Sequence, residues 1–134
     1  MDACVKQAYQ QYPAEITQQL LTLRTIIFDV ASEAKLGPVQ ECLKWQEPSY
    51  ISKHGSTLRL GWKPARPHHY FAYVNCKTQL IATYKALYPT ELTYEGNRAI
   101  AFSLGQRYPT FAIKHCFELA LTYHRVKDLP LLGA

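Results

Sequence analysis

The sequence has no long apolar run, and no segment approaches the roughly 18 apolar residues that a membrane-spanning helix needs. Its first residues, from Met1 to Cys4, lack the basic and then apolar pattern of a secretory signal peptide. We therefore expect a cytoplasmic protein that does not enter the membrane. The four cysteines are widely scattered, and in a reducing compartment they are expected to be free thiols.

The motifs of several enzyme classes are also missing. There is no Walker loop, no dinucleotide-binding glycine pattern and no Gly-x-Ser-x-Gly nucleophile elbow. Cys-x-x-Cys and His-x-x-Glu-His are absent, and the five histidines follow no regular ligand spacing. We therefore predict neither a cofactor nor a metal site, and no motif in the sequence indicates an enzymatic activity.

Acidic residues are missing from the centre of the chain, between Glu47 and Glu91. The formal net charge of the whole chain is +5, so the positive excess comes from this central stretch. A positive potential favours an anionic partner, although a solvated basic face without a partner is the alternative. The cations of the stretch are Lys53, Arg59, Lys63, Arg66, Lys77 and Lys85.

Apolar periodicity predicts two long helices, one toward each end of the chain. The first runs from Pro13 to Ala34, with apolar residues at every third or fourth position. The other starts at Pro109, and His124 is the last member of its apolar stripe. Shorter helices are expected before Pro13 and over residues 78–87.

Between the helices, short β-rich segments predict about five strands. Residues 40–45 are ambiguous, with a helical turn as one interpretation, and Gly96-Asn97 has the composition of a two-residue hairpin turn. We therefore predict one α+β domain over residues 1–134, in which an antiparallel sheet carries the N- and C-terminal helices on one face. The predicted strands are 49–51, 57–63, 69–74, 92–95 and 98–103.

Strand alternation places cations and aromatic rings together on the sheet face that the helices leave open. These residues are Arg59, Lys63, His69, Phe71 and Tyr73. Interleaved cations and rings suit a small anionic or aromatic ligand, and they also resemble the platforms that bind single-stranded nucleic acid. An apolar patch left uncovered on this face would equally serve as a homodimer interface.

Other unusual residues extend the set of candidates. By strand alternation, Arg98 lies on the same side of its strand as two residues that are expected in the core. Because a buried arginine needs an anionic partner, Arg98 either reaches solvent beside the turn or binds an anion at the rim of a cleft. Glu41 and Glu47 are the best candidates for a functional carboxylate, with a surface cap or an ion pair as the alternative. The candidate ligand-binding residues are Trp45, Glu47, Tyr50, Arg59, Trp62, Lys63, His69, Tyr73 and Arg98.

The pattern Glu41-x-x-x-Trp45-x-x-Pro48-x-Tyr50, followed later by Asn97-Arg98-Ala99-Ile100-Ala101-Phe102, resembles the YdhG-like family of uncharacterised domains. This resemblance implies an α+β sandwich with terminal helices on one side of an antiparallel sheet. It also implies a frataxin-like iron-chaperone role, as described for some members, which would use acidic residues of the first long helix and the sheet edge. Here that helix offers Glu15, Asp29 and Glu33.

The leading functional hypothesis from the sequence is a non-catalytic binding module. It would hold a small anionic or aromatic ligand, or a protein partner, in a groove near Trp45, Tyr50, Trp62 and Tyr73. The alternatives are an intracellular iron chaperone and a protein that binds single-stranded nucleic acid.

Overall fold

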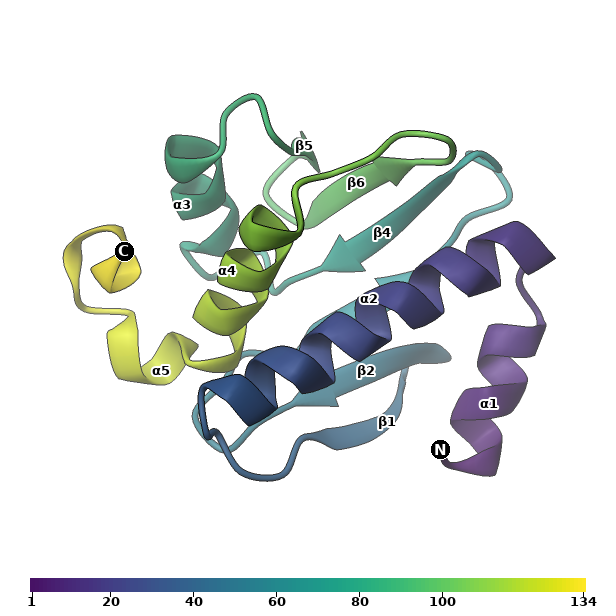
Figure 1. Cartoon of the computed structure of the whole chain (residues 1–134), viewed down its shortest axis with the longest axis horizontal. Coiled ribbons are helices and arrows are strands. Elements are labelled where there is room, and N and C mark those ends of the chain that lie inside the picture. The colour runs from purple at the N-terminus through teal and green to yellow at the C-terminus, as the bar shows by residue number, and fades with distance from the viewer.

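A six-stranded antiparallel sheet forms the centre of the computed structural model, which describes residues 1–134 (Figure 1). Every neighbouring pair of strands is antiparallel. The predicted α+β class is confirmed, with six strands in place of about five. In spatial order the strands are β1 (Gln40–Lys44), β2 (Glu47–Ile51), β3 (Leu58–Gly61), β4 (His69–Tyr73), β6 (Ala99–Ser103) and β5 (Thr93–Glu95).

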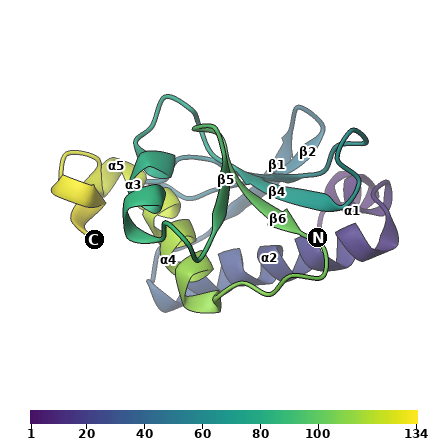
Figure 2. The same ribbon diagram turned by 90° about the horizontal axis from the view of Figure 1, so that it is seen from above.

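Two long helices, α2 (Ala14–Glu33) and α4 (Thr110–Leu121), cover one face of the sheet (Figure 2). The apolar stripe of α2 is buried, and Ile16, Leu20 and Ile27 are fully inaccessible. Consecutive members of this set are four and seven positions apart, which puts them on one side of a helix. The stripe packs on Leu60 and the other strand residues of the same parity, and together they form the main core.

Shorter elements complete the chain. Helix α1 (Ala3–Gln10) confirms the helix expected before Pro13, and the side chain of Asp2 caps it by accepting from the amide of Cys4 at 2.8 Å. The helix expected over residues 78–87 is α3 (Leu80–Leu87). After α4 come α5 (Tyr123–Val126) and a 3-10 turn (Pro130–Gly133). No helix combines the length and the apolar character needed to cross a membrane.

The structure corrects the interpretation of residues 40–45. They do not form a helical turn, because residues 40–44 are strand β1 and residue 45 begins the turn that follows it. The residues Trp45 and Gln46 join β1 to β2 with φ angles of 54° and 62°. Two consecutive positive φ angles are typical of a tight two-residue hairpin turn, where Asn-Gly is the usual sequence. Because Trp-Gln does not carry this signature, the sequence alone did not indicate the hairpin.

The predicted apolar stripe of the last helix also needs a correction at its end. Helix α4 stops at Leu121, and Thr122, with φ −116° and ψ 11°, separates it from α5. His124 is therefore exposed instead of extending the stripe. Its backbone amide donates to the carbonyl of His54 at 2.9 Å, which ties α5 to the loop between β2 and β3.

Gly55 allows that loop to lie directly on the end of α4. A Cβ atom at this position would be 2.7 Å from the backbone oxygen of Leu121, and the amide of Ser56 donates to Ala120 at 2.9 Å. We expect Gly55→Ala to lower the free energy of unfolding by about 2 kcal/mol, because backbone atoms cannot easily give way. Urea denaturation measures this loss.

Gly61→Ala is the matched control for that experiment. At Gly61 the new methyl group would meet the carboxylate end of Glu47, which is flexible and can rotate away. The loss of stability should therefore be clearly smaller than for Gly55→Ala. Equal losses would show that close backbone packing at Gly55 is unimportant.

Candidate functional site

The sheet face opposite the helices has the residues that strand parity predicted. Arg59 is paired with Tyr73, and Gly61 with Phe71, across β3 and β4. His69 is two residues before Phe71 on β4 and therefore lies on the same face. Lys63 follows the end of β3, and its ammonium group lies 4.9 Å from the centre of the Phe71 ring. We call this surface the open face.

One half of the open face is closed by its own cations. Phe71 is fully inaccessible, because Lys63 and Arg66 lie over its ring at 4.9 and 5.1 Å. Both cations also form ion pairs with Glu95 of β5, at 3.5 and 2.9 Å. This half therefore offers no free Phe71 ring, although the sequence predicted one, and the single carboxylate of Glu95 offsets one of its two positive charges.

Next to it, Glu47 extends across β3 toward Arg59. Its Oε1 lies 2.8 Å from Arg59 Nε, and the guanidinium group lies 5.0 Å from the centre of the Tyr73 ring. The Nε atom is buried but makes no well-aligned hydrogen bond, so the contact is an ion pair. Gly61 makes room for this carboxylate, since a Cβ there would collide with it.

Burial raises the pKa of Glu47 above its usual value, and the nearby Arg59 and Lys63 offset this only in part. The folded state thus holds the proton more tightly than the unfolded chain. The contribution of Glu47 to stability is complete below its ordinary pKa and is lost as the pH rises through the raised value.

We therefore expect the stability of Glu47→Gln, relative to the natural protein, to increase between pH 4 and pH 7. Glutamine mimics the protonated acid and does not ionise, so the variant avoids the penalty that the natural protein acquires. Urea unfolding at the two pH values measures the difference. A relative stability that decreases over this range would mean that Arg59 favours the ionised Glu47 more than burial opposes it.

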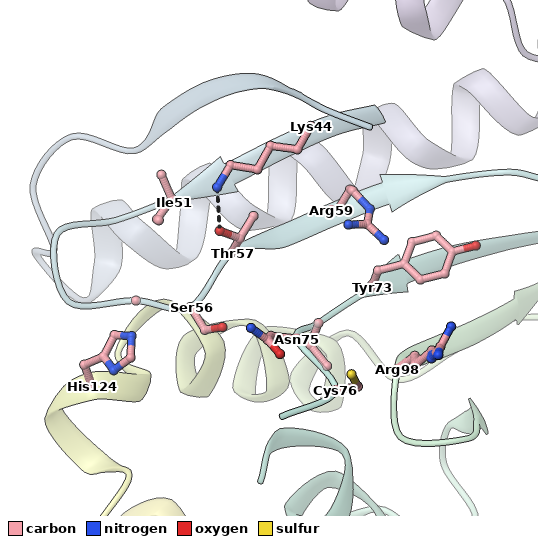
Figure 3. A pocket seen from close by; sticks show the side chains of 12 residues that line it. Lys44, Ile51, Ser56, Thr57, Arg59, Tyr73, Asn75, Cys76, Arg98 and His124 are labelled. Atoms are coloured by element: carbon pink, nitrogen blue, oxygen red, sulfur yellow. Dashed lines mark hydrogen bonds between the residues drawn. The ribbon is translucent and has the colours of Figure 1, made fainter. Parts of the chain in front are cut away.

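The other half of the open face contains a cavity of about 530 Å³, seen in Figure 3. We call it the cationic pocket, because three cations from separate segments, Lys44, Arg59 and Arg98, line it and no carboxylate does. Its floor is formed where β3, β4 and the turn before β6 lie side by side. The polar and charged side chains around it belong to Lys44, Ser56, Thr57, Arg59, Tyr73, Asn75, Cys76, Arg98 and His124.

The cations of this pocket are mostly uncompensated. None of the ion pairs in the structure includes Lys44, Arg98 or His124. Lys44 Nζ donates to Thr57 Oγ1 at 3.3 Å, which is a contact with a neutral group. Arg59 alone has an acidic partner, Glu47. The pocket therefore has two cations without an acidic partner, Lys44 and Arg98, whereas every lysine and arginine elsewhere on the open face contacts a carboxylate.

The structure brings three of the predicted site residues together in this pocket, namely Arg59, Tyr73 and Arg98. Arg98 is exposed beside the turn, which was one of the two interpretations of its position in the sequence. Because Glu95 pairs with Ala99, Arg98 is the third residue of the turn and not the first of strand β6. Glu47 lies beside the pocket through its ion pair with Arg59.

The predicted groove near Trp45, Tyr50, Trp62 and Tyr73 does not exist. Tyr50 is fully buried on the helix-covered face, and Trp45 is 86% exposed at the tip of the β1–β2 hairpin. Trp62 lies against Tyr12, with 6.3 Å between the ring centres, and its indole donates to the carbonyl of Pro67. These side chains are separated because they point to different sides of the sheet or beyond its end.

Apart from the thiol of Cys76, five polar residues of the pocket were missed from the sequence. Lys44 and His124 were overlooked because the hairpin and the break after α4 were not foreseen. The other three carry no signal except their position in loops, where ligand contacts are common. They are Ser56, Thr57 and Asn75.

The second candidate carboxylate, Glu41, has a structural role on the opposite face. It accepts from Arg24 Nε at 2.6 Å and from the hydroxyl of Tyr50 at 2.7 Å, while the hydroxyl groups of Tyr50 and Tyr9 are 2.6 Å apart. Burial acts to raise the pKa of Glu41, but the hydrogen bonds from Arg24 and Tyr50 outweigh it and lower this pKa. These four side chains connect α1, α2, β1 and β2.

No family model, no curated protein and no solved structure matches this chain. In the structure, no three side chains of His, Cys, Asp or Glu lie together in a way that could hold a metal ion. The function is therefore inferred from the fold and from the cationic pocket.

Proposed function

We propose that this protein binds a small anionic ligand in the cationic pocket, as a binding module and not as a catalyst. The observation that carries this proposal is the lining of the cavity, which contains Lys44, Arg59 and Arg98 but no carboxylate. Cavities of roughly 300–1,000 Å³ are typical of small-molecule sites, and this one is about 530 Å³.

The neutral side chains of the pocket are hydrogen-bond donors that suit the same ligand. Asn75 Oδ1 accepts from the amide of Lys77 at 2.8 Å, which leaves the NH₂ group of Asn75 for a ligand. Ser56 and Thr57 add hydroxyl groups. Guanidinium groups match the planar, multidentate geometry of phosphate and carboxylate, so we expect one of these groups in the ligand.

Two observations favour a small anion over the other functions that the sequence suggested. Cations around the cavity repel ferrous iron, which opposes an iron-chaperone role at this site. Nucleic-acid strands stack their bases on free rings, but Phe71 is covered and Arg59 lies over Tyr73. The family resemblance stays a prediction.

Calorimetry tests the proposal directly. We expect inorganic phosphate and citrate, titrated at constant ionic strength, to bind with a stoichiometry of one, whereas the neutral sugar glucose gives only heat of dilution. The affinity should fall as sodium chloride is added, because salt screens exposed charges. If neither anion gives a saturable signal at millimolar concentration, the proposed function is wrong.

A further inference from the structure

The arginines of the cationic pocket gather at one end of it. Three neighbouring strands form this end, because β3 pairs with β4 and β4 pairs with β6. They carry Arg59 on β3, Tyr73 on β4 and Arg98 in the turn before β6. Neighbouring strands are about 4.8 Å apart, so Arg59 and Arg98 flank Tyr73 from its two sides. Figure 3 shows both guanidinium groups on the Tyr73 side of the pocket. We call this the arginine end.

A second group of polar side chains, those of Ser56 and His124, lies at the opposite end. Ser56 is three residues before Arg59, a distance of roughly 10 Å for extended chain. His124 lies there, held by the hydrogen bond between its amide and His54, and Figure 3 places it far from Tyr73 and Arg98. We call this the histidine end.

Charges around the histidine end extend the same positive potential. The pKa of His54 is lowered, first by loss of solvent around its ring and then by the charges of Arg125, Lys53 and His124. No carboxylate is among the groups that act on it. Neither Lys53 nor Arg125 takes part in any ion pair. Both ends of the pocket therefore attract anions, with Lys44 and Thr57 between them.

We infer that the ligand carries two anionic groups set roughly 10 Å apart, one bound at the arginine end and the other at the histidine end. This inference rests on the proposed function and narrows its ligand class to compounds such as sugar bisphosphates. A ligand with one anionic group would leave one end of the pocket unused. Two adjacent phosphates would be too close together to reach both ends.

Three probe compounds distinguish the effect of the distance between two phosphate groups from the effect of total ligand charge. Fructose 1,6-bisphosphate has two separated phosphates, fructose 6-phosphate has one on the same sugar, and inorganic pyrophosphate has two adjacent ones. We expect calorimetry at constant ionic strength to give a dissociation constant for the bisphosphate at least about tenfold lower than for either other probe. Equal affinities for the bisphosphate and pyrophosphate, or for the two sugar phosphates, would overturn the inference.

Variants at the histidine end provide an independent measure. His124→Gln should reduce the preference for the bisphosphate over fructose 6-phosphate, because the second phosphate loses a side chain that lines the pocket. Lys53→Gln should also reduce it, because a positive charge near this end is lost. Arg107→Gln, an exposed arginine in the loop between β6 and α4, should retain the full preference. If both histidine-end variants retain it as well, the second anionic group does not bind there.

The proposed function and this inference fail in different ways. If the single phosphate binds but the bisphosphate has no advantage, only the two-group inference is lost. If none of the three probes binds, the proposed function itself is lost.

Discussion

Replacing Arg24 with methionine is expected to lower the free energy of unfolding by about 3 kcal/mol, because the variant leaves Glu41 ionised without its cation. The side chain of Glu41 is only 11% exposed, and Arg24 contacts both of its carboxylate oxygens, at 2.6 and 3.2 Å. Methionine keeps most of the apolar stem of Arg24, whereas the guanidinium group that lies 4.7 Å from the centre of the Phe28 ring is removed. Urea denaturation at pH 7 measures the loss.

The double variant Arg24→Met with Glu41→Leu is the control. Removing both charges should restore most of the stability, since no buried charge then lacks a partner. The hydroxyl of Tyr50 would keep its contact with Tyr9 at 2.6 Å. A loss for Arg24→Met of only about 0.5 kcal/mol, as for an exposed ion pair, would show that solvent already screens this network.

The same network predicts that the folded protein loses stability as the pH falls. Because the pKa of Glu41 is lowered in the folded state, its contribution to stability is present above its ordinary value and is lost as the pH falls through the lowered one. This direction is opposite to that expected for Glu47. Arg24→Met should therefore lose less stability on acidification than the natural protein loses.

Replacing Arg98 with glutamate is expected to weaken phosphate binding at least about 30-fold. The change removes one cation and adds an anion in a pocket whose lining contains no other carboxylate. Replacing a positive with a negative charge beside a bound phosphate near the surface should reduce the binding free energy by about 2 kcal/mol or more. Arg98 is exposed and has no ion-pair partner, so the fold should tolerate the change. Calorimetry with inorganic phosphate measures the loss.

Arg107→Glu changes the net charge of the protein by the same amount at a site outside the pocket. It should reduce phosphate affinity by no more than about twofold, because exposed distant charges are screened by salt. Equal losses for the two variants would mean that phosphate responds to net charge and not to the cationic pocket.

Local periodicity was sufficient for the α+β class, the two long helices and the faces of the central strands, although it did not indicate β1. The stripe of α2 and the alternation of β3 and β4 indicated which side chains enter the core, and Arg59 and Tyr73 were correctly placed on one face. Such patterns depend only on residues that are close in sequence. They therefore remain informative without any knowledge of how distant segments meet.

The site itself depends on contacts between distant segments. Lys63 and Arg66 lie in the acid-free stretch, yet Glu95, about 30 residues away, forms ion pairs with both and offsets one of their two charges. His124 reaches the cationic pocket because α4 ends at Leu121, and no residue pattern indicated this end of the helix. An acid-free segment in sequence is thus not an acid-free region in space, and the pocket became visible only in the structure.

Nuclear magnetic resonance of the ¹⁵N-labelled protein tests most directly whether the cationic pocket selects anions. On titration with inorganic phosphate at constant ionic strength, we expect amide shifts that saturate together and are concentrated at residues 55–59, 73–76, 98 and 124. Shifts spread evenly over exposed lysines across the molecule, or no saturable shift at these positions, would contradict the claim.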